Sequence, residues 1–120
     1  MDENYQSAGS TTIATDVLLT IAQLTALSVP GVSRLSPLRG KGMELFLKHG
    51  QARDGIKIEV ADDIVYADIY VILKNDINVR DASHNIQRDV ARAISEMVGM
   101  QVGRINIHIE DIDYPMEAKA

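Results

Sequence analysis

Apolar residues recur at a helical spacing in two separate stretches of the chain. The first stretch predicts a helix over about residues 16–28, because its apolar residues lie three and four positions apart. Thr15 or Asp16 suits the N-cap position, where a short polar side chain can bond a free backbone N–H. Pro30 disfavours a helical conformation in the residue before it, so the helix should end near residue 28.

The second stretch predicts a longer helix over residues 79–98, with one apolar stripe facing a core. Asn78 precedes it and is a favoured N-cap residue. Gly99 follows it and suits the left-handed conformation with which many helices end.

Strict alternation of apolar and polar residues predicts β-strands between and after the helices. Residues 56–60 and 64–74 alternate on either side of Asp62-Asp63, which predicts a hairpin with a tight turn. A last strand is expected over about residues 102–112, and a short extended piece over residues 32–35. The glycine-rich stretch at residues 36–55 is expected to be a long loop with room for one helical turn at residues 43–47.

This order, α-β-β-β-α-β, predicts an α+β domain in which two helices pack on one face of a small mixed sheet of three or four strands. We expect the domain to span residues 13–114, between a flexible N-terminal tail at 1–12 and a C-terminal tail at 115–120. The strand–helix–strand connection favours a right-handed crossover. Such a crossover can place the last strand beside residues 56–62 rather than beside the strand before it.

Composition narrows the classes of function. With 120 residues, 46% of them apolar, the chain is one domain with a real core. The absence of cysteine excludes disulfides, thiolate zinc sites and a cysteine nucleophile. A net charge of −5 argues against binding to a phosphate backbone. The start of the chain is acidic, unlike a signal peptide, and no apolar run approaches the length of a membrane span, so we expect a cytoplasmic protein.

Catalytic, cofactor and metal sites are not predicted. The sequence contains neither a Gly-x-Ser-x-Gly elbow nor a phosphate-binding Gly-x-x-x-x-Gly-Lys-Ser/Thr loop. His108 and Glu110 lie on the same side of the last strand, but two ligands fall short of the three or four that a zinc site needs.

Several short motifs occur in a characteristic order. They are Ile21-Ala22, Val29-Pro30-Gly31-Val32, the strand at residues 65–71, Ile86-Gln87 with Val90, and the block at residues 93–102 leading into residues 105–109. Together they resemble the bacterial alkaline shock protein family, also called the envelope stress response family, over about residues 12–114. The resemblance implies a non-enzymatic cytoplasmic protein that self-associates and is recruited to the membrane by a separate anchor protein.

Charge is unevenly distributed along the chain. The segment at residues 34–53 carries five basic residues and one acidic residue, a balance of +4 against −9 for the remainder. A basic segment on an acidic chain can contact a second copy, although a solvated loop would have the same composition. The partner-binding candidates in this segment are the basic residues and an apolar anchor, namely Arg39, Lys41, Phe46 and Lys48.

A second candidate surface is the face of the sheet that the helices do not cover. Tyr66, Tyr70 and Ile72 alternate onto that face of the strand at residues 64–74. Tyrosine is enriched in interface cores, although open, half-polar sheet faces are equally common on monomers.

Three functions are therefore compatible with the sequence. The first is a self-associating interaction or scaffold module linked to envelope stress. The alternative is a KH-like nucleic-acid-binding domain that uses the basic loop, although a Gly-x-x-Gly clamp between two helices is missing and aromatic residues for stacking are scarce. The third is a small-molecule regulator, which no sequence feature favours.

Overall fold

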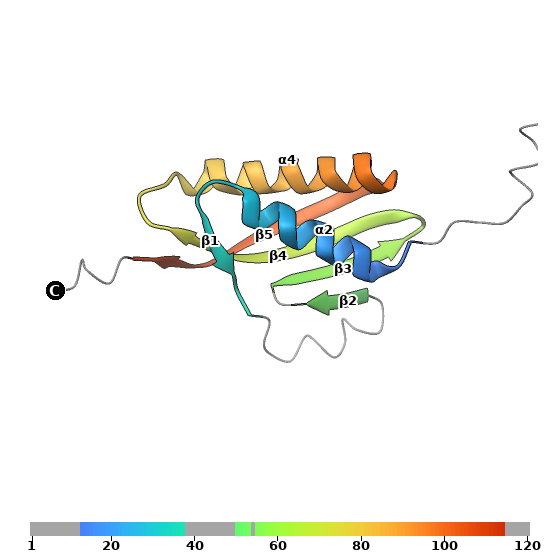
Figure 1. Cartoon of the computed structure of the whole chain (residues 1–120), viewed down its shortest axis with the longest axis horizontal. Helices are drawn as coiled ribbons and strands as arrows, with labels where there is room; N and C mark the ends of the chain where they lie inside the picture. The colour runs from blue at the N-terminus through green and yellow to red at the C-terminus, as the bar shows by residue number, and fades with distance from the viewer. Residues whose placement is uncertain (1–12, 38–49, 54, 115–120) are drawn as a thin grey trace, which may run out of the picture.

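The structure is a computed structural model that describes residues 13–37, 50–53 and 55–114. These residues form two helices and five strands (Figure 1). The elements follow one another as α2 (Thr15–Ser28), β1 (Val32–Leu35), β2 (Gly50–Arg53), β3 (Ile56–Ala61), β4 (Ile64–Lys74), α4 (Val79–Val98) and β5 (Gln101–Asp113). The α+β class and the helices on one side of a mixed sheet are confirmed. The tails predicted at residues 1–12 and 115–120 lie outside the described residues.

Strand β4 is the centre of the sheet. Strand β5 runs parallel to it and pairs along its whole length, from Ile64 to Lys74. The other edge of β4 is shared by two antiparallel strands, β3 beside residues 64–69 and β1 beside residues 71–73. Strand β2 continues the sheet beyond β3. The prediction that the last strand lies beside residues 56–62 is wrong, because β2 occupies the outer edge of β3 and β5 takes the free edge of β4.

Strand β2 falls in the stretch that was expected to be a loop. It pairs with β3 as a hairpin in which Arg53 lies opposite Ile56. The sequence between those two residues is Asp54-Gly55, a dipeptide typical of two-residue hairpin turns. Gly55 has a φ of 78°, in the left-handed region that such turns require. The helical turn considered at residues 43–47 lies outside the described residues.

The hairpin predicted between β3 and β4 is confirmed, with Ala61 paired to Ile64. Asp62 and Asp63 form the turn with φ values of 54° and 63°. Positive φ at both central residues defines a type I′ turn, whose twist matches that of the flanking strands.

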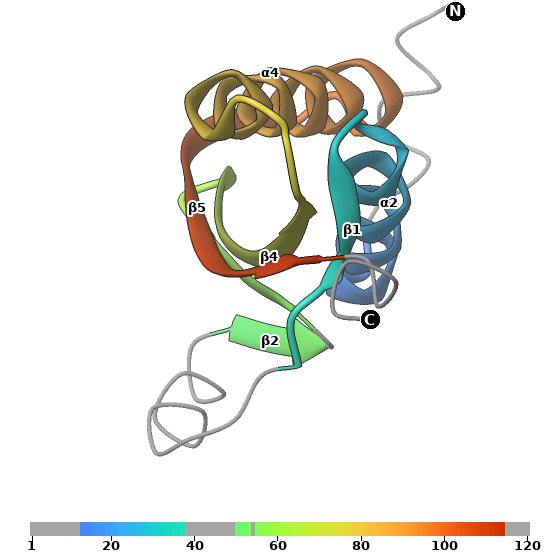
Figure 2. The same cartoon turned by 90° about the vertical axis from the view of Figure 1, so that its left-hand side faces the viewer.

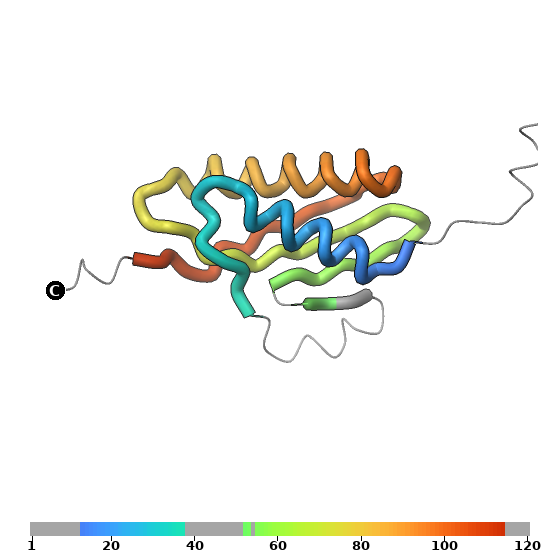
Figure 3. Tube along the Cα trace, in the orientation of Figure 1, coloured from blue at the N-terminus to red at the C-terminus, as the bar shows by residue number. Residues whose placement is uncertain are grey.

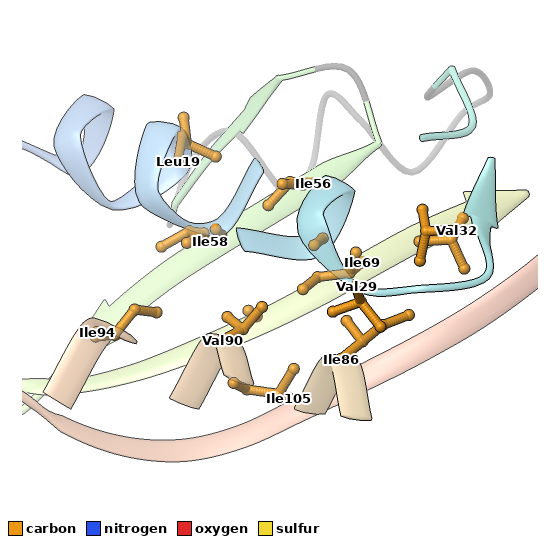
Figure 4. Close-up of a cluster of buried hydrophobic side chains, with 14 of the residues drawn as sticks. Leu19, Val29, Val32, Ile56, Ile58, Ile69, Ile86, Val90, Ile94 and Ile105 are labelled. Carbon is orange, nitrogen blue, oxygen red and sulfur yellow. The ribbon is translucent and has the colours of Figure 1, made fainter. Parts of the chain in front are cut away.

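The core lies between the sheet and the two helices (Figure 4). All five predicted inward residues of β4 are at most 2% exposed: Val65, Ala67, Ile69, Val71 and Leu73. Helix α4 covers them with a stripe of residues four apart: Ala82, Ile86, Val90 and Ile94. Helix α2 contributes Leu18, Leu19, Ala22 and Ala26. Full burial of one large aliphatic side chain contributes roughly 1.5–3 kcal/mol, so this layer is the main source of stability.

The ends of α4 are as predicted. The Asn78 side chain accepts a hydrogen bond from the backbone N–H of Asp81, at 2.9 Å. Gly99 ends the helix with a φ of 78° and a ψ of 15°, and its N–H donates to the carbonyl oxygen of Ser95. Asn78 satisfies a free amide at the start, and Gly99 a free carbonyl at the end.

The start of α2 differs from the prediction. The helix begins at Thr15 after Ala14, and no side chain caps it. The Asp16 carboxylate instead pairs with the Arg53 guanidinium of β2 at 2.6 Å, and Arg53 also donates to the Thr20 hydroxyl at 2.8 Å. The polar side chains at this end therefore tie the edge strand β2 to the helix.

Both helices lie on the concave side of a curved sheet, as the end-on view shows (Figure 2). The chain trace shows α2 starting near the β3–β4 turn and the end of α4 (Figure 3). An open cleft of about 760 Å³ at this end is lined by Ile13, Val60, Val98 and Met100, with polar neighbours. The convex side of the sheet, called the outer face below, carries no helix of the described chain.

Candidate interaction site on the outer sheet face

The outer face collects side chains from the three long strands. Asp68 lies opposite Asn106 and Tyr70 lies opposite His108 in the parallel register of β4 and β5. On the other side of β4, Lys57 of β3 lies opposite Asp68. Because side chains alternate across a strand, all five of these residues point away from the helices.

Four of these side chains contact one another directly. The Asp68 carboxylate accepts a hydrogen bond from the Asn106 amide at 3.1 Å and lies 2.9 Å from Nε2 of His108 through the same oxygen. The His108 ring stacks on the Tyr70 ring, with centroids 4.3 Å apart and planes inclined by 10°. The Lys57 ammonium lies 5.4 Å from the centroid of the Tyr70 ring. We call these five residues the outer-face cluster.

The side chains of the outer-face cluster hold one another through these contacts and are still accessible. The side chains of Asp68 and His108 are 32% and 39% exposed. Stacked rings and a shared carboxylate fix the rotamers of side chains that would otherwise move freely on a surface. Binding of a partner to this surface would therefore cost less side-chain conformational entropy than binding to freely moving side chains.

Tyr66 extends this surface towards the start of β4. A Cβ at Gly103 would lie 2.5 Å from Cε1 of Tyr66, so the ring lies directly against the glycine backbone of β5. Beside it, a shallow cleft of about 270 Å³ is lined by Glu59, Asp68, Arg104 and Asn106, together with Tyr66 and Ala67. The cleft combines acidic, basic and amide groups.

Ile72 also belongs to this face by alternation, but it is only 5% exposed. A register shift in β1 brings Arg34 opposite Ile72, and a second shift in β5 brings Asp111 opposite it on the other side. Polar side chains of both neighbouring strands thus flank Ile72, which contributes packing rather than accessible surface. Tyr66 and Tyr70 are half-buried and remain accessible.

An ion pair closes the same end of the sheet. The Asp113 carboxylate accepts hydrogen bonds from Arg34, both at 3.3 Å, and from the Ser33 hydroxyl at 2.5 Å. The Arg34 guanidinium, followed by the Ser33 hydroxyl, lowers the pKa of Asp113 below its ordinary value. The contact joins β1 to β5 across the end of β4.

The basic segment can be compared with the structure only at its ends. Arg39, Lys41, Phe46 and Lys48 lie outside the described residues, so their part in binding stays a prediction. Arg34 and Arg53, at the ends of the segment, pair with Asp113 and Asp16 of the same chain.

In the part of the chain that the structure describes, no group of three or more His, Asp or Glu side chains is placed so that it could bind a metal ion. Asp68 and His108 form a pair, and that pair is already joined by its own hydrogen bond. No helix within the described ranges combines the length and the apolar character needed to cross a membrane.

Sequence reasoning found the tyrosines of this face but missed the cluster that holds them. The cluster depends on β5 lying beside β4, which the prediction placed elsewhere. The signal was present in the alternation of Asp68 and Tyr70 on one strand and of Asn106 and His108 on the other. A second missed feature is an apolar strip on α2: Val17, Leu24 and Leu27 share the helical spacing of the buried residues but are 42–61% exposed.

The fold and this face define a class of protein: a small α+β domain whose helices cover one side of the sheet and leave the other side exposed. The chain belongs to the alkaline shock protein 23 family, a family with a cell envelope-related function, which it matches over residues 3–114. The resemblance seen in the sequence motifs is thereby confirmed.

Individual relatives agree with this assignment. The Bacillus subtilis (strain 168) protein YqhY is 28% identical over an alignment of 122 residues, which covers 99% of this chain and 88% of the relative. The Streptococcus pyogenes serotype M6 protein Spy1535 is 31% identical over 105 residues, which cover 87% of this chain and 79% of the relative. A solved structure of MamM-CTD matches 82% of this chain and 99% of its own length, with a TM-score of 0.50 and 13% identity. At that identity the likeness concerns the fold alone.

Proposed function

We propose that the protein is a non-enzymatic interaction module. It self-associates, and it binds a partner protein through its outer sheet face. The observation that carries this proposal is the outer-face cluster, in which Tyr70, His108, Asp68 and Asn106 hold one another in place on an uncovered sheet. Tyrosine-rich, preorganised patches with satisfied polar groups are typical of interface cores.

The polar groups of this face favour binding over catalysis. The accessible histidine already stacks on Tyr70 and contacts Asp68, so its nearer ring nitrogen serves the surface itself. A general base needs a nitrogen or carboxylate within hydrogen-bond reach of the proton that it removes from a substrate. The outer face is an open sheet surface, which suits contact with another macromolecule.

We propose two partners, and the cell envelope-related function of the family is compatible with both. The first is a further copy of the chain. The second is a small membrane-anchor protein, which would hold this otherwise cytoplasmic chain at the envelope. The outer-face cluster is the surface that we assign to the anchor protein.

Fractionation of the native cells tests the assignment of the outer face. The full chain should sediment in part with the membranes. The substitution Tyr70→Asp removes the ring on which His108 stacks and places a second carboxylate beside that of Asp68, so the two carboxylates repel each other. This variant should therefore move to the soluble fraction. Circular dichroism of the purified variant checks that its fold is retained.

Tyr114→Asp is the matched control. Tyr114 is 64% exposed and follows the end of β5, away from the cluster. This control should distribute as the wild type does. Equal membrane association of the folded Tyr70→Asp variant and the wild type would contradict the assignment, as would a wild-type chain that never sediments with membranes.

A further inference from the structure

Strand β5 has one edge without a strand beside it among the described residues. Its other edge pairs with β4 over its full length of 13 residues. Figure 2 shows β5 at the margin of the sheet, with β4 on one side only. An edge strand of this length presents a row of backbone N–H and C=O groups that a further strand can pair with.

Two bulges divide this strand symmetrically. Gly103 and Arg104 together face the single residue Tyr66 of β4, and Glu110 lies unpaired between the partners of Val71 and Ile72. Both bulges lie three residues from Ile107, one on each side. The regular part of the edge is therefore the five-residue segment from Ile105 to Ile109, which we call the edge segment.

The edge segment is complementary to itself in antiparallel register. It reads Ile-Asn-Ile-His-Ile, so a twofold axis at Ile107 would place Ile105 opposite Ile109 and Asn106 opposite His108. Apolar residues would meet on the core side and an amide would meet an imidazole on the outer side. Matched cross-strand pairs of this kind contribute to sheet pairing.

Charges beyond the edge segment fit the same register. Arg104 of one copy would lie opposite Glu110 of the other, and by symmetry this contact would occur twice. Both side chains are exposed, and neither has an ion-pair partner within the described part of the chain. In an isologous contact residue i meets residue j twice, so this pair of opposite charges makes the surface complementary to itself.

The space beside the strand also suits a partner. A groove of about 320 Å³ runs between α4 and β5, lined by Gln87, Ala91, Val102 and Ile105 with the bulge residues. Ile107 and Ile109 are only partly buried at this edge, although they pack against the core. The Gln87 amide donates to the carbonyl oxygen of Ile105 at 3.0 Å, and a strand that reached this carbonyl would replace that contact.

We infer that a second copy of this chain pairs with the free edge of β5, antiparallel and with its twofold axis at Ile107. This inference rests on the self-association in the proposed function and specifies its surface. The two sheets become one continuous sheet, and the two outer-face clusters come to lie side by side. The bulges confine regular pairing to the edge segment, and the twofold symmetry closes the contact as a dimer rather than a filament.

Cysteine cross-linking tests the register directly, because the chain contains no cysteine of its own. Asn106→Cys and His108→Cys chains, mixed and oxidised, should form a covalent heterodimer, since these positions lie directly opposite each other. Each variant alone places its two cysteines on a diagonal, about 7–8 Å apart, which exceeds the Cβ separation that a disulfide allows. We expect at least about tenfold less cross-linking in each variant alone than in the mixture.

Ser95→Cys, on the exposed side of α4, measures the background from random collisions. Circular dichroism confirms that each variant folds. Cross-linking of the mixture at this background level would overturn the edge contact, and equal cross-linking in the single variants would overturn its register. Sedimentation of the wild type separates the two proposals: a dimer without cross-linking leaves self-association standing through another surface, whereas a monomer removes both.

Charge exchange gives a second measurement that needs no cysteine. Arg104→Glu sets like charges against Glu110 of the other copy at two positions and should raise the dimer dissociation constant about tenfold at low salt. The double variant Arg104→Glu with Glu110→Arg restores opposite charges and should regain most of the affinity. A single variant that dimerises as the wild type does, or a double variant that stays as weak as the single one, would contradict the contact.

Discussion

Gly55 is the position at which one added methyl group should cost this fold the most. Its φ of 78° is unfavourable for a residue with a Cβ, at about 1–2 kcal/mol. A Cβ there would also lie 2.6 Å from the Cβ of Leu35 and 3.1 Å from the carbonyl oxygens of Ser36 and Tyr70. Two of these three neighbours are backbone atoms of β4 and of the chain after β1, so they cannot rotate away. Overpacking of this kind costs about 1–3 kcal/mol more, so we expect Gly55→Ala to lose about 2–5 kcal/mol.

Gly99→Ala is the matched control for this prediction. Gly99 has the same φ of 78°, but an added Cβ would meet no atom within 4 Å. The Gly99→Ala variant should therefore lose only the conformational part of the free energy of unfolding, about 1–2 kcal/mol. Urea denaturation of both variants at one low protein concentration gives the two free energies of unfolding, with self-association held constant. A Gly55→Ala variant that loses no more stability than Gly99→Ala would refute the reasoning.

Three further predictions concern single residues. The pKa of Asp113 is lower in the folded chain than in the unfolded chain, so the stabilisation by this carboxylate is present above the unfolded value near 3.8 and is lost as the pH falls through the folded value. In urea denaturation from pH 7 to pH 2, the difference in unfolding free energy between the wild type and Asp113→Asn should therefore disappear below about pH 4. A difference that stays constant over this range would contradict the ion pair. Asn78→Ala removes the cap of α4 and should cost about 1 kcal/mol in the same assay at pH 7, whereas an unchanged free energy would show that the cap is dispensable. Asp63→Gly relieves a φ of 63° in the type I′ turn and should raise the free energy of unfolding by about 0.5–1 kcal/mol, seen as a higher melting temperature; a lower one would contradict the turn assignment.

Much of the fold could be predicted because local pattern and tertiary packing agree. The alternation along β4 matches the observed burial from Ile64 to Val71, since that strand is covered by helices on one side only. Asn78 and Gly99 mark the ends of α4 through local backbone chemistry, which needs no knowledge of the rest of the chain. The buried face of α2 was harder to predict, because Val17 and Leu24 keep the helical spacing yet are exposed.

The remainder depends on contacts between residues far apart in the sequence. The partner of β5 is decided by which strand edges are free, and β2 fills an edge that the prediction left open. The outer-face cluster joins Asp68 to His108 across 40 positions and follows only once that partner is known. The burial of Ile72 results from register shifts in β1 and β5, which strict alternation cannot foresee.

The two proposed binding surfaces also follow from the arrangement of the sheet. A sheet with helices on one side only exposes its other face and its outermost strand, and in this chain both carry side chains arranged for contact. The tyrosines of the outer face could be predicted from alternation along one strand. The symmetry of β5 about Ile107 became visible only when its pairing with β4 located the two bulges.

Sedimentation velocity of the full chain, from micromolar to hundreds of micromolar concentrations, tests the central claim most directly. The chain has a mass of 13.2 kDa. If it is a self-associating module, the weight-average mass should rise with concentration and approach twice that value. A mass that stays at 13.2 kDa across the whole range would contradict self-association.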